Sequence, residues 1–347
     1  MRLVEEQLTR IFKENNIAGM AIAITDKEKI VYAKGFGVDN MERPEIPAGA
    51  DSMYRIASVT KIVTGITIMR LVEQGILELD SPVCKYVPWL TLSHPEAVER
   101  MTLRHLLSHT SGLPKEYTPD GPRDESALEQ SLREELPVAP MQSLPGDGAY
   151  LYSNLGIRLA SYIAQVATGK LFSTLVQEYV LTPLKMDRST FELRVAATYP
   201  MSLPHEETAE GELKVFHRIM ENAVRLAAGG LYSNTEDMCK LARFLLNKGV
   251  ADTGERLLSP ESIQQMFTYH GSDLSQDQYS YGLTIQLKKY KEGYLYGHPG
   301  SANPYATSVF VDHVSGYGVV TLLNTYRNQL TRDIPVVVLD IIRDSLA

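Results

Sequence analysis

The chain has 347 residues, of which 44% are hydrophobic and 22% charged, so it is long and apolar enough to build a substantial core and is not expected to be disordered. Its formal net charge is −8, and its scattered lysines and arginines form no basic stripe, which argues against a nucleic-acid partner. No apolar run approaches the roughly 20 residues that span a bilayer, so we expect no membrane span.

Residues 1–16 carry charges throughout, and their apolar positions follow a helical period, which predicts a helix rather than a signal peptide. The two cysteines, Cys84 and Cys239, lack metal-ligand spacing and are interpreted as reduced thiols. Both features favour a cytoplasmic protein. The alternative, a mature form whose leader was removed, stays open.

The next segments predict the start of a sheet followed by a buried helix. Met20–Thr25 and Lys29–Gly37 are β-rich runs joined by a short polar turn, which is typical of a hairpin. After a polar stretch and a strand-like run at Met53–Ala57, a strongly apolar helical pattern begins at Ser58 and ends at Gly75. This pattern is apolar nearly all round, as in a buried central helix.

From residue 77 to residue 220 the pattern is mostly helical, with the clearest helices at Leu103–Ser108, Leu155–Ala167 and Phe172–Tyr179. A capping-box spacing from Ser233 to Glu236 then predicts a helix that continues to Leu246. Residues 77–220 are expected to be a helical insertion between two strand-forming parts of the chain.

The C-terminal part returns to a strand pattern and then to a final helix. The predicted strands are Tyr281–Tyr290, Gly293–Tyr296, Ser308–Val311 and Tyr317–Leu323, and the helix is Arg332–Leu346. We therefore expect an α/β (α+β) three-layer sandwich, an antiparallel sheet flanked by helices. Residues 1–76 and 221–347 would form this sheet domain and residues 77–220 an inserted, mainly helical domain, with an active site at their interface.

Ser58 and Lys61 are the first candidate catalytic pair. Their spacing places the hydroxyl and the amine one turn apart on the same helix face, where they can share a proton. A lysine in so apolar a helix is unusual, and burial favours its neutral amine, which can accept the serine proton. The alternative is that Ser58 is a helix N-cap and that Lys61 reaches solvent.

Tyr152 and Asn154 follow a loop at residues 145–148 and open a helical pattern. In an extended segment, side chains two residues apart point the same way. A phenol beside a lysine could relay a proton to a leaving group, and an amide could fix a carbonyl. The alternative is a core tyrosine and a capping asparagine.

His298, Pro299 and Gly300 form a third candidate stretch, placed where a strand is expected to begin. Gly300 would let a substrate approach the strand edge. The alternative for His298 is a structural role. Six further histidines lack metal-ligand spacing and are interpreted as structural or surface residues: His105, His109, His205, His217, His270 and His313. We expect neither a metal nor a cofactor.

In this order and at these separations, the three stretches resemble the motifs of the serine β-lactamases and penicillin-binding proteins, particularly the class C-like branch, for which the Ser-x-x-Lys element is a known signature. The resemblance covers nearly the whole chain, and further stretches that support it are 103–113, 145–156 and 228–233.

The resemblance implies a role for each matching residue. Ser58 would be the nucleophile, and Lys61 and Tyr152 would share the general base and acid work. Asn154 would orient the substrate. His298, Pro299 and Gly300 would stand where many relatives carry Lys-Thr-Gly, and the backbone N–H groups of Ser58 and Ser301 would form the oxyanion hole.

Pro299 departs from the family pattern, because it has neither the hydroxyl nor the N–H that a substrate carboxylate could contact. His298 would add a positive charge that titrates near neutral pH. The leading prediction is therefore a serine hydrolase (an esterase or peptidase) that acts through an acyl-enzyme on a small ester or a D-amino-acid amide or peptide.

Two alternatives stay open. One is a β-lactamase or D-Ala-D-Ala carboxypeptidase, and the other is a binding or sensor protein of the same fold that is acylated without turnover. The expected partner is a small substrate or short peptide, and the sequence does not indicate an oligomeric state.

Overall fold

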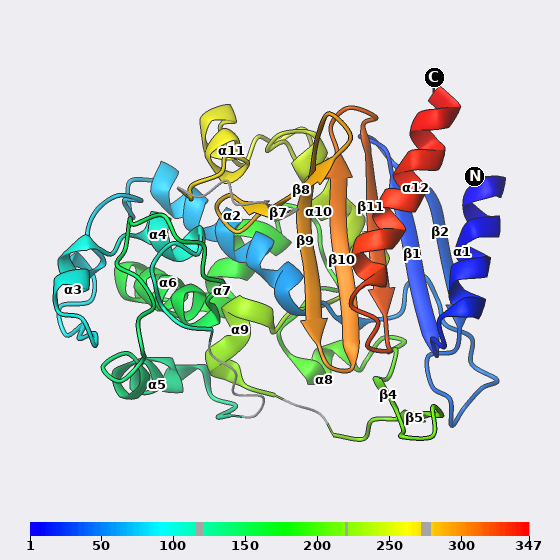
Figure 1. Ribbon diagram of the computed structural model, residues 1–347, viewed down its shortest axis with the longest axis horizontal. Coiled ribbons are helices and arrows are strands. Elements are labelled where there is room, and N and C mark those ends of the chain that lie inside the picture. The colour runs from blue at the N-terminus through cyan, green and yellow to red at the C-terminus, as the bar shows by residue number, and fades with distance from the viewer. Residues whose placement is uncertain (116–120, 219–220, 272–278, 347) are drawn as a thin grey trace.

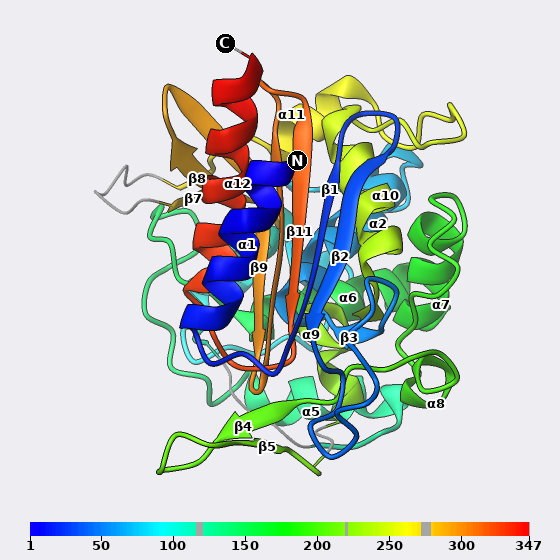
Figure 2. The same ribbon diagram turned by 90° about the vertical axis from the view of Figure 1, so that its right-hand side faces the viewer.

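The computed structural model describes residues 1–115, 121–218, 221–271 and 279–346. Its centre is an antiparallel sheet, seen edge-on in Figure 2, with helices against both faces. In the residues described, this sheet has seven strands in the spatial order β2, β1, β11, β10, β9, β8, β7. Their bounds are β1 Gly19–Thr25, β2 Ile30–Gly37, β7 Tyr279–Tyr281, β8 Gln286–Tyr290, β9 Gly293–Ala302, β10 Tyr305–Asp312 and β11 Tyr317–Leu323.

The side chains of β1 show how the sheet joins its two helical layers. Met20, Ile22 and Ile24 pack with α1 (Arg2–Glu14) and α12 (Leu330–Leu346) on one face. Ala21 and Ala23 alternate with them and belong to the larger core on the opposite face, which includes α2 (Thr60–Glu73) and α10 (Thr235–Leu246). This period of two is what a sheet buried on both faces requires. The expected three-layer arrangement of an antiparallel sheet between helices is confirmed.

Most other helices gather beside α2, away from the sheet (Figure 1). The α-helices there and around them are α3 Glu96–Arg100, α4 Leu103–Leu107, α5 Leu128–Glu135, α6 Asn154–Thr168, α7 Phe172–Val176, α8 Leu193–Ala196, α9 Leu226–Gly229 and α11 Pro260–Met266. Short 3-10 turns are η1 Ala57–Val59, η2 Val83–Lys85, η3 Glu125–Ala127 and η5 Ala223–Arg225, and η4 Gln177–Leu181 is a π-helical turn. Two small ribbons pair β3 Tyr54–Arg55 with β6 Tyr232–Ser233, and β4 His205–Glu207 with β5 Leu213–Val215.

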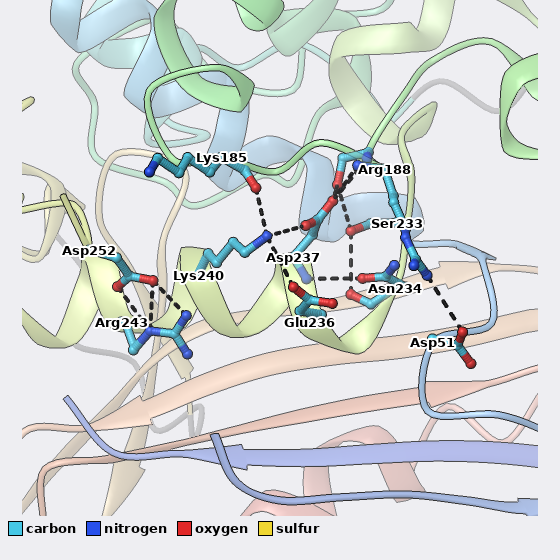
Figure 3. Close-up of polar contacts among 11 residues, drawn as sticks. Asp51, Lys185, Arg188, Ser233, Asn234, Glu236, Asp237, Lys240, Arg243 and Asp252 are labelled. Carbon is cyan, nitrogen blue, oxygen red and sulfur yellow. Dashed lines mark hydrogen bonds and ion pairs between the residues drawn. The ribbon is translucent and has the colours of Figure 1, made fainter. Parts of the chain in front are cut away.

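A polar cluster fixes the start of α10 against the neighbouring loop (Figure 3). Asn234 caps the helix by accepting a hydrogen bond from the Asp237 N–H at 2.9 Å. The Asp237 carboxylate in turn accepts bonds from the N–H groups of Arg188 at 3.0 Å and Ser189 at 2.9 Å. Lys240 donates to Asp237 at 3.0 Å and to the carbonyl of Lys185 at 2.6 Å. The predicted capping box at Ser233 is therefore wrong by one residue, because Ser233 lies in β6.

Three strand predictions also need correction. The continuous strand expected over Tyr281–Tyr290 is broken between β7 and β8, where Thr284 has a φ of +61°, a conformation foreign to a strand. The stretch around His298 is not the start of a strand, because β9 runs without interruption from Gly293 to Ala302. Within the strand-like run at Met53–Ala57, only Tyr54–Arg55 form a strand, β3.

Other expectations hold. Almost all of α2 is buried, as its apolar pattern predicts. Both cysteines are free thiols. In the described part of the chain, none of the helices is long and apolar enough to cross a membrane. The division at residues 76 and 220 stays a prediction, and its second boundary falls outside the described residues.

Candidate active site

Ser58 lies in a tight turn between β3 and α2. The residue before it, Ala57, has a φ of +49°, which is uncommon for a residue with a side chain and is a form of strain found at functional sites. The turn is held on both sides, because the Ile56 N–H donates to the Leu231 carbonyl at 2.9 Å and the Ile56 carbonyl accepts from Thr307 Oγ1 at 2.7 Å. Ser58 is thus presented by a rigid backbone. It is not the side-chain cap of α2.

Lys61 is fully buried on the first turn of α2. Its Nζ donates to Ser58 Oγ at 3.0 Å and to the Ala228 carbonyl at 2.6 Å. The side chain does not reach outward to solvent, so the structure excludes that alternative. The amine is held against the hydroxyl by a second, backbone contact, which is the geometry needed for proton exchange between them.

Tyr152 approaches the same hydroxyl from the other side. Its OH donates to Ser58 Oγ at 2.9 Å, and Lys61 Nζ lies 4.9 Å from the centre of its ring. Burial raises the pKa of Tyr152, and the hydrogen bond to Ser58 offsets only part of that rise. The phenol is therefore protonated at neutral pH and is prepared to donate a proton.

Aromatic rings surround Tyr152. The ring of His109 lies 4.4 Å from it, that of His298 6.2 Å and that of Tyr281 6.5 Å, between centroids. His109 also accepts a hydrogen bond from the Ser153 N–H at 3.2 Å, which fixes the backbone beside Tyr152. Burial, followed by the charge of Lys61, keeps the pKa of His109 well below its usual value. His109 is structural, as the sequence indicates, but it contacts a proposed catalytic side chain.

His298 is 3% exposed, and both of its ring nitrogens have partners. Nδ1 lies 2.5 Å from the Pro299 carbonyl, and Nε2 lies 2.9 Å from the Tyr281 hydroxyl. A carbonyl only accepts, so Nδ1 carries the proton and Nε2 accepts from the phenol. Burial, followed by the charge of Lys61, lowers the pKa of His298 to about 3. The expectation that His298 is a cation titrating near neutral pH is therefore wrong.

Gly300 and Ser301 lie on β9 beside the Ser58 turn. A Cβ on Gly300 would come within 2.3 Å of the Ile56 carbonyl oxygen, so this glycine allows the strand to pack against the turn. This close packing, and not only substrate access, explains why residue 300 is a glycine. β8 pairs with β9 only up to Gly297, and Ser301 lines a cleft beyond that point.

Asn154 is the first residue of α6 and lines the same cleft. The cap of this helix is Ser153, whose Oγ accepts from the Gly156 N–H at 2.9 Å. The alternative in which Asn154 is the capping residue is therefore wrong. The structure thus brings Ser58, Tyr152 and Asn154 to one cleft, with Lys61 beneath them.

The cleft has a volume of about 640 Å³, a size typical of small-molecule sites. Four cationic side chains line it, and none of the described lining residues is an aspartate or a glutamate: the cations are Arg55, Lys115, Arg225 and Arg332. In a chain of net charge −8, these four side chains place positive charges in the cleft that Ser58 lines. The sequence did not reveal these residues, because they come from four separate segments without a shared motif.

Tyr150 and Gln286 also line the cleft, and neither was a candidate from the sequence. Tyr281 was missed as well. Its only signal in the sequence was its place at the start of the predicted strand Tyr281–Tyr290, where a periodicity argument cannot distinguish it from an ordinary core aromatic. Its ring lies 5.6 Å from both Tyr150 and His298, between centroids.

Comparisons with known proteins show the family and the fold of the chain. The chain is 24% identical over 316 residues to Protein flp of Staphylococcus aureus (strain MW2), and the match covers 90% of this chain but only 60% of that protein. The octameric penicillin-binding protein homologue from Pyrococcus abyssi superposes with a TM-score of 0.83 at 26% identity, over 98% of this chain and 77% of that one.

A second solved structure, EstCE1, described as a hydrolase with promiscuous acyltransferase activity, superposes with a TM-score of 0.81 at 21% identity, over 98% of this chain and 97% of that one, and shows the shared fold. The family model described as Beta-lactamase matches residues 2–340, nearly the whole chain. With its antiparallel sheet, flanking helices and β-lactamase/transpeptidase-like fold, the chain belongs to the Beta-lactamase family.

Proposed function

We propose that the protein is a serine hydrolase that forms an acyl-enzyme on Ser58 and hydrolyses a small ester or a D-amino-acid amide or peptide. The observation that carries this proposal is the double contact at Ser58 Oγ, which accepts from Lys61 Nζ at 3.0 Å and from the Tyr152 OH at 2.9 Å. An acyl transfer needs a nucleophile, a base and an acid within hydrogen-bond reach of one another, and these three groups meet that need.

Each group has a defined task in this reaction. Ser58 Oγ attacks the substrate carbonyl while Lys61, as the neutral amine, takes its proton. The backbone N–H groups of Ser58 and Ser301 stabilise the oxyanion, a contribution of about 3 to 4 kcal/mol per donor in other enzymes. Tyr152 gives a proton to the departing alcohol or amine and regains one through Lys61. Water then attacks the ester carbonyl and releases Ser58.

A panel of p-nitrophenyl esters and D-aminoacyl anilides tests the proposal. We expect turnover of at least one substrate class by the unaltered protein, and a loss of at least about 10³-fold in Ser58→Ala, in the range seen when catalytic groups are removed. Ser345→Ala, an exposed serine on α12, is the matched control and should retain full activity. Equal turnover by Ser58→Ala and the unaltered protein would overturn the proposal.

A second candidate is a β-lactamase or D-Ala-D-Ala carboxypeptidase, and the four cations of the cleft favour it. Pro299 removes one carboxylate contact and His298 is neutral, but Arg332, whose charge acts on both His298 and Tyr152, lies in the same cleft. A hydrogen bond to a charged group contributes about 1.5 to 3 kcal/mol. If the substrate carries a carboxylate, Arg332→Gln should lower kcat/KM for nitrocefin or an acyl-D-Ala-D-Ala peptide at least about tenfold.

A neutral ester measured with the same variant is the control, and its kcat/KM should change far less. Equal losses for acidic and neutral substrates would remove the second candidate. Rapid stoichiometric trapping of a β-lactam without any ester turnover would instead favour a sensor protein of this fold.

A further inference from the structure

A second, apolar pocket lies beside the catalytic cleft. It has a volume of about 210 Å³ and is formed by the α8 region, the segment after it, and the turn between β9 and β10. Its apolar lining consists of Leu193, Ala197, Met201, Leu203, Pro204, Phe216, Tyr232, Ala302, Pro304 and Tyr305. Leu193, Met201, Leu203 and Phe216 are only partly buried, so a concave surface of large apolar side chains stays open here.

This pocket adjoins the catalytic cleft. Arg55, Ala302 and Asn303 line both spaces. Strand β9 passes from His298 through Gly300 and Ser301 to Ala302, so the strand that borders Ser58 ends at the entrance of the apolar pocket. A molecule bound along this strand edge can therefore reach Ser58 with one end and the pocket with the other.

The position of the proton donor Tyr152 determines on which side of Ser58 the leaving group of a substrate lies. Tyr152 contacts Ser58 Oγ and lies among His109, Tyr281 and His298, so the departing group must be on that side to receive its proton. The acyl group would then extend from the carbonyl the other way, along β9 toward Ala302. We propose that this apolar pocket, lined by Leu193, Met201, Leu203, Phe216 and Tyr305, binds an apolar acyl chain or ring of the substrate. The proposal rests on the function proposed above.

The size of the pocket sets the class of acyl group. A protein cavity of about 150 Å³ lined by apolar side chains accommodates benzene. The volume of about 210 Å³ therefore suits a phenyl ring or a short alkyl chain, but not a long fatty acyl chain. The hydroxyl of Tyr305 donates to the Ser202 carbonyl at 2.7 Å and is used within the protein, so it does not make the pocket polar.

A series of p-nitrophenyl esters tests the proposal with the leaving group held constant. Each buried methylene should raise kcat/KM about three- to fourfold. We expect kcat/KM to rise in this way from acetate to butyrate to hexanoate, and also for phenylacetate. A flat or falling series would overturn the proposal, as would a rise seen only when the alcohol is lengthened in acetate esters, since the pocket would then hold the leaving group.

Two tryptophan substitutions, one within α8 and one at the residue that follows it, provide the structural control. Ala197 lines the pocket, whereas Val195 is 46% exposed and does not. Ala197→Trp should lower kcat/KM for the hexanoate at least tenfold more than for the acetate, because the indole occupies the pocket. Val195→Trp should leave the ratio of the two esters unchanged. Equal losses for both esters in Ala197→Trp would contradict the proposal.

Failure of this inference is distinguishable from failure of the proposed function. If p-nitrophenyl acetate is hydrolysed and the activity disappears in Ser58→Ala, while chain length has no effect, the acyl pocket is wrong and the serine hydrolase stands. If no ester is hydrolysed in a Ser58-dependent way, the proposed function itself is wrong, and this inference falls with it.

Discussion

Lys61 and Lys240 are two lysines of this protein with different surroundings. β3 and β6 pair with each other, and each leads into a helix, α2 with Lys61 and α10 with Lys240. Lys61 Nζ donates to the hydroxyl of Ser58 and the carbonyl of Ala228. Lys240 Nζ contacts the carboxylates of Asp237 at 3.0 Å and Glu236 at 3.4 Å, as Figure 3 shows.

The difference lies in the charge of the partners. Burial alone lowers the pKa of Lys240, but the hydrogen bond and charge of Asp237 outweigh it and raise that pKa. Lys240 therefore stays an ammonium and helps to fix the start of α10. Lys61 Nζ instead donates to the hydroxyl of the proposed nucleophile Ser58, where a proton-transfer role is open to it. A lysine paired with carboxylates stabilises structure, whereas one placed on a serine hydroxyl suits chemistry.

We expect the largest loss of activity when the amine of Lys61 is removed. Lys61→Met keeps an unbranched side chain of similar length in the buried site but removes the amine. We expect kcat/KM to fall by about 10³-fold or more, near the upper part of the range for general acid–base groups. Steady-state kinetics with any active ester measures this. Retention of near-normal activity would assign the base role to another group.

Tyr152→Phe tests the partner on the other side of Ser58. The ring and its contacts with His109 are kept, and only the phenol is lost. We expect kcat to fall by about 10²-fold while the thermal midpoint changes little. The effect should be larger for amides than for p-nitrophenyl esters, because an amine leaving group needs a proton. A variant with full activity would make Tyr152 a packing residue.

Lys240→Met is the matched variant on the other helix. It leaves the Asp237 carboxylate, which is 2% exposed, without one of its donors. We expect the free energy of unfolding to fall by about 2 kcal/mol, measured by denaturant titration, with kcat/KM within about twofold of the unaltered protein. A large loss of activity at unchanged stability would contradict the division of roles between the two lysines.

The smallest effect that we expect is a dependence of the free energy of unfolding on pH, caused by His298. Its pKa is about 3 in the folded protein and near 6.5 when unfolded, so the unfolded chain binds more protons between these values. Stability contributed by the neutral ring is therefore present above about pH 6.5 and is lost as the pH falls toward 3, by up to about 1.4 kcal/mol per pH unit.

The variant His298→Gln removes this contribution. The free energy of unfolding, measured from pH 4 to pH 7, should depend less steeply on pH in the variant than in the unaltered protein. Equal slopes in the two proteins would show that His298 titrates normally and is not held neutral by burial.

The sequence predicted that Ser58, Lys61 and Tyr152 meet, but it did not predict their surroundings. Ser58, Lys61 and Tyr152 stand in recognisable motifs, and helical spacing already places the first two together. The cations of the cleft could not be predicted, because Arg55, Lys115, Arg225 and Arg332 meet only through the tertiary fold. The state of His298 depends on Tyr281, 17 residues away on another strand, and on complete burial, neither of which a local pattern contains.

Prediction of the fold from local sequence patterns has the same limit. Alternation and periodicity located the antiparallel sheet and the buried helix α2. They missed the break before β8, because the positive φ of Thr284 is imposed by contacts such as its N–H bond to the Leu107 carbonyl at 2.9 Å. They also placed His298 at the start of a strand, whereas β9 begins at Gly293 and continues through Pro299. Here β8 pairing ends at Gly297, which makes Pro299 acceptable within β9.

The most direct test is the position of a covalent adduct. A fluorophosphonate reacts with an activated serine, and peptide mass spectrometry locates the modified residue. We predict one adduct per chain, on Ser58, formed quickly in the unaltered protein, at least about 10²-fold more slowly in Lys61→Met, and not at all in Ser58→Ala. An adduct on another serine, or one that persists in Ser58→Ala, would contradict the assignment of Ser58 as the nucleophile.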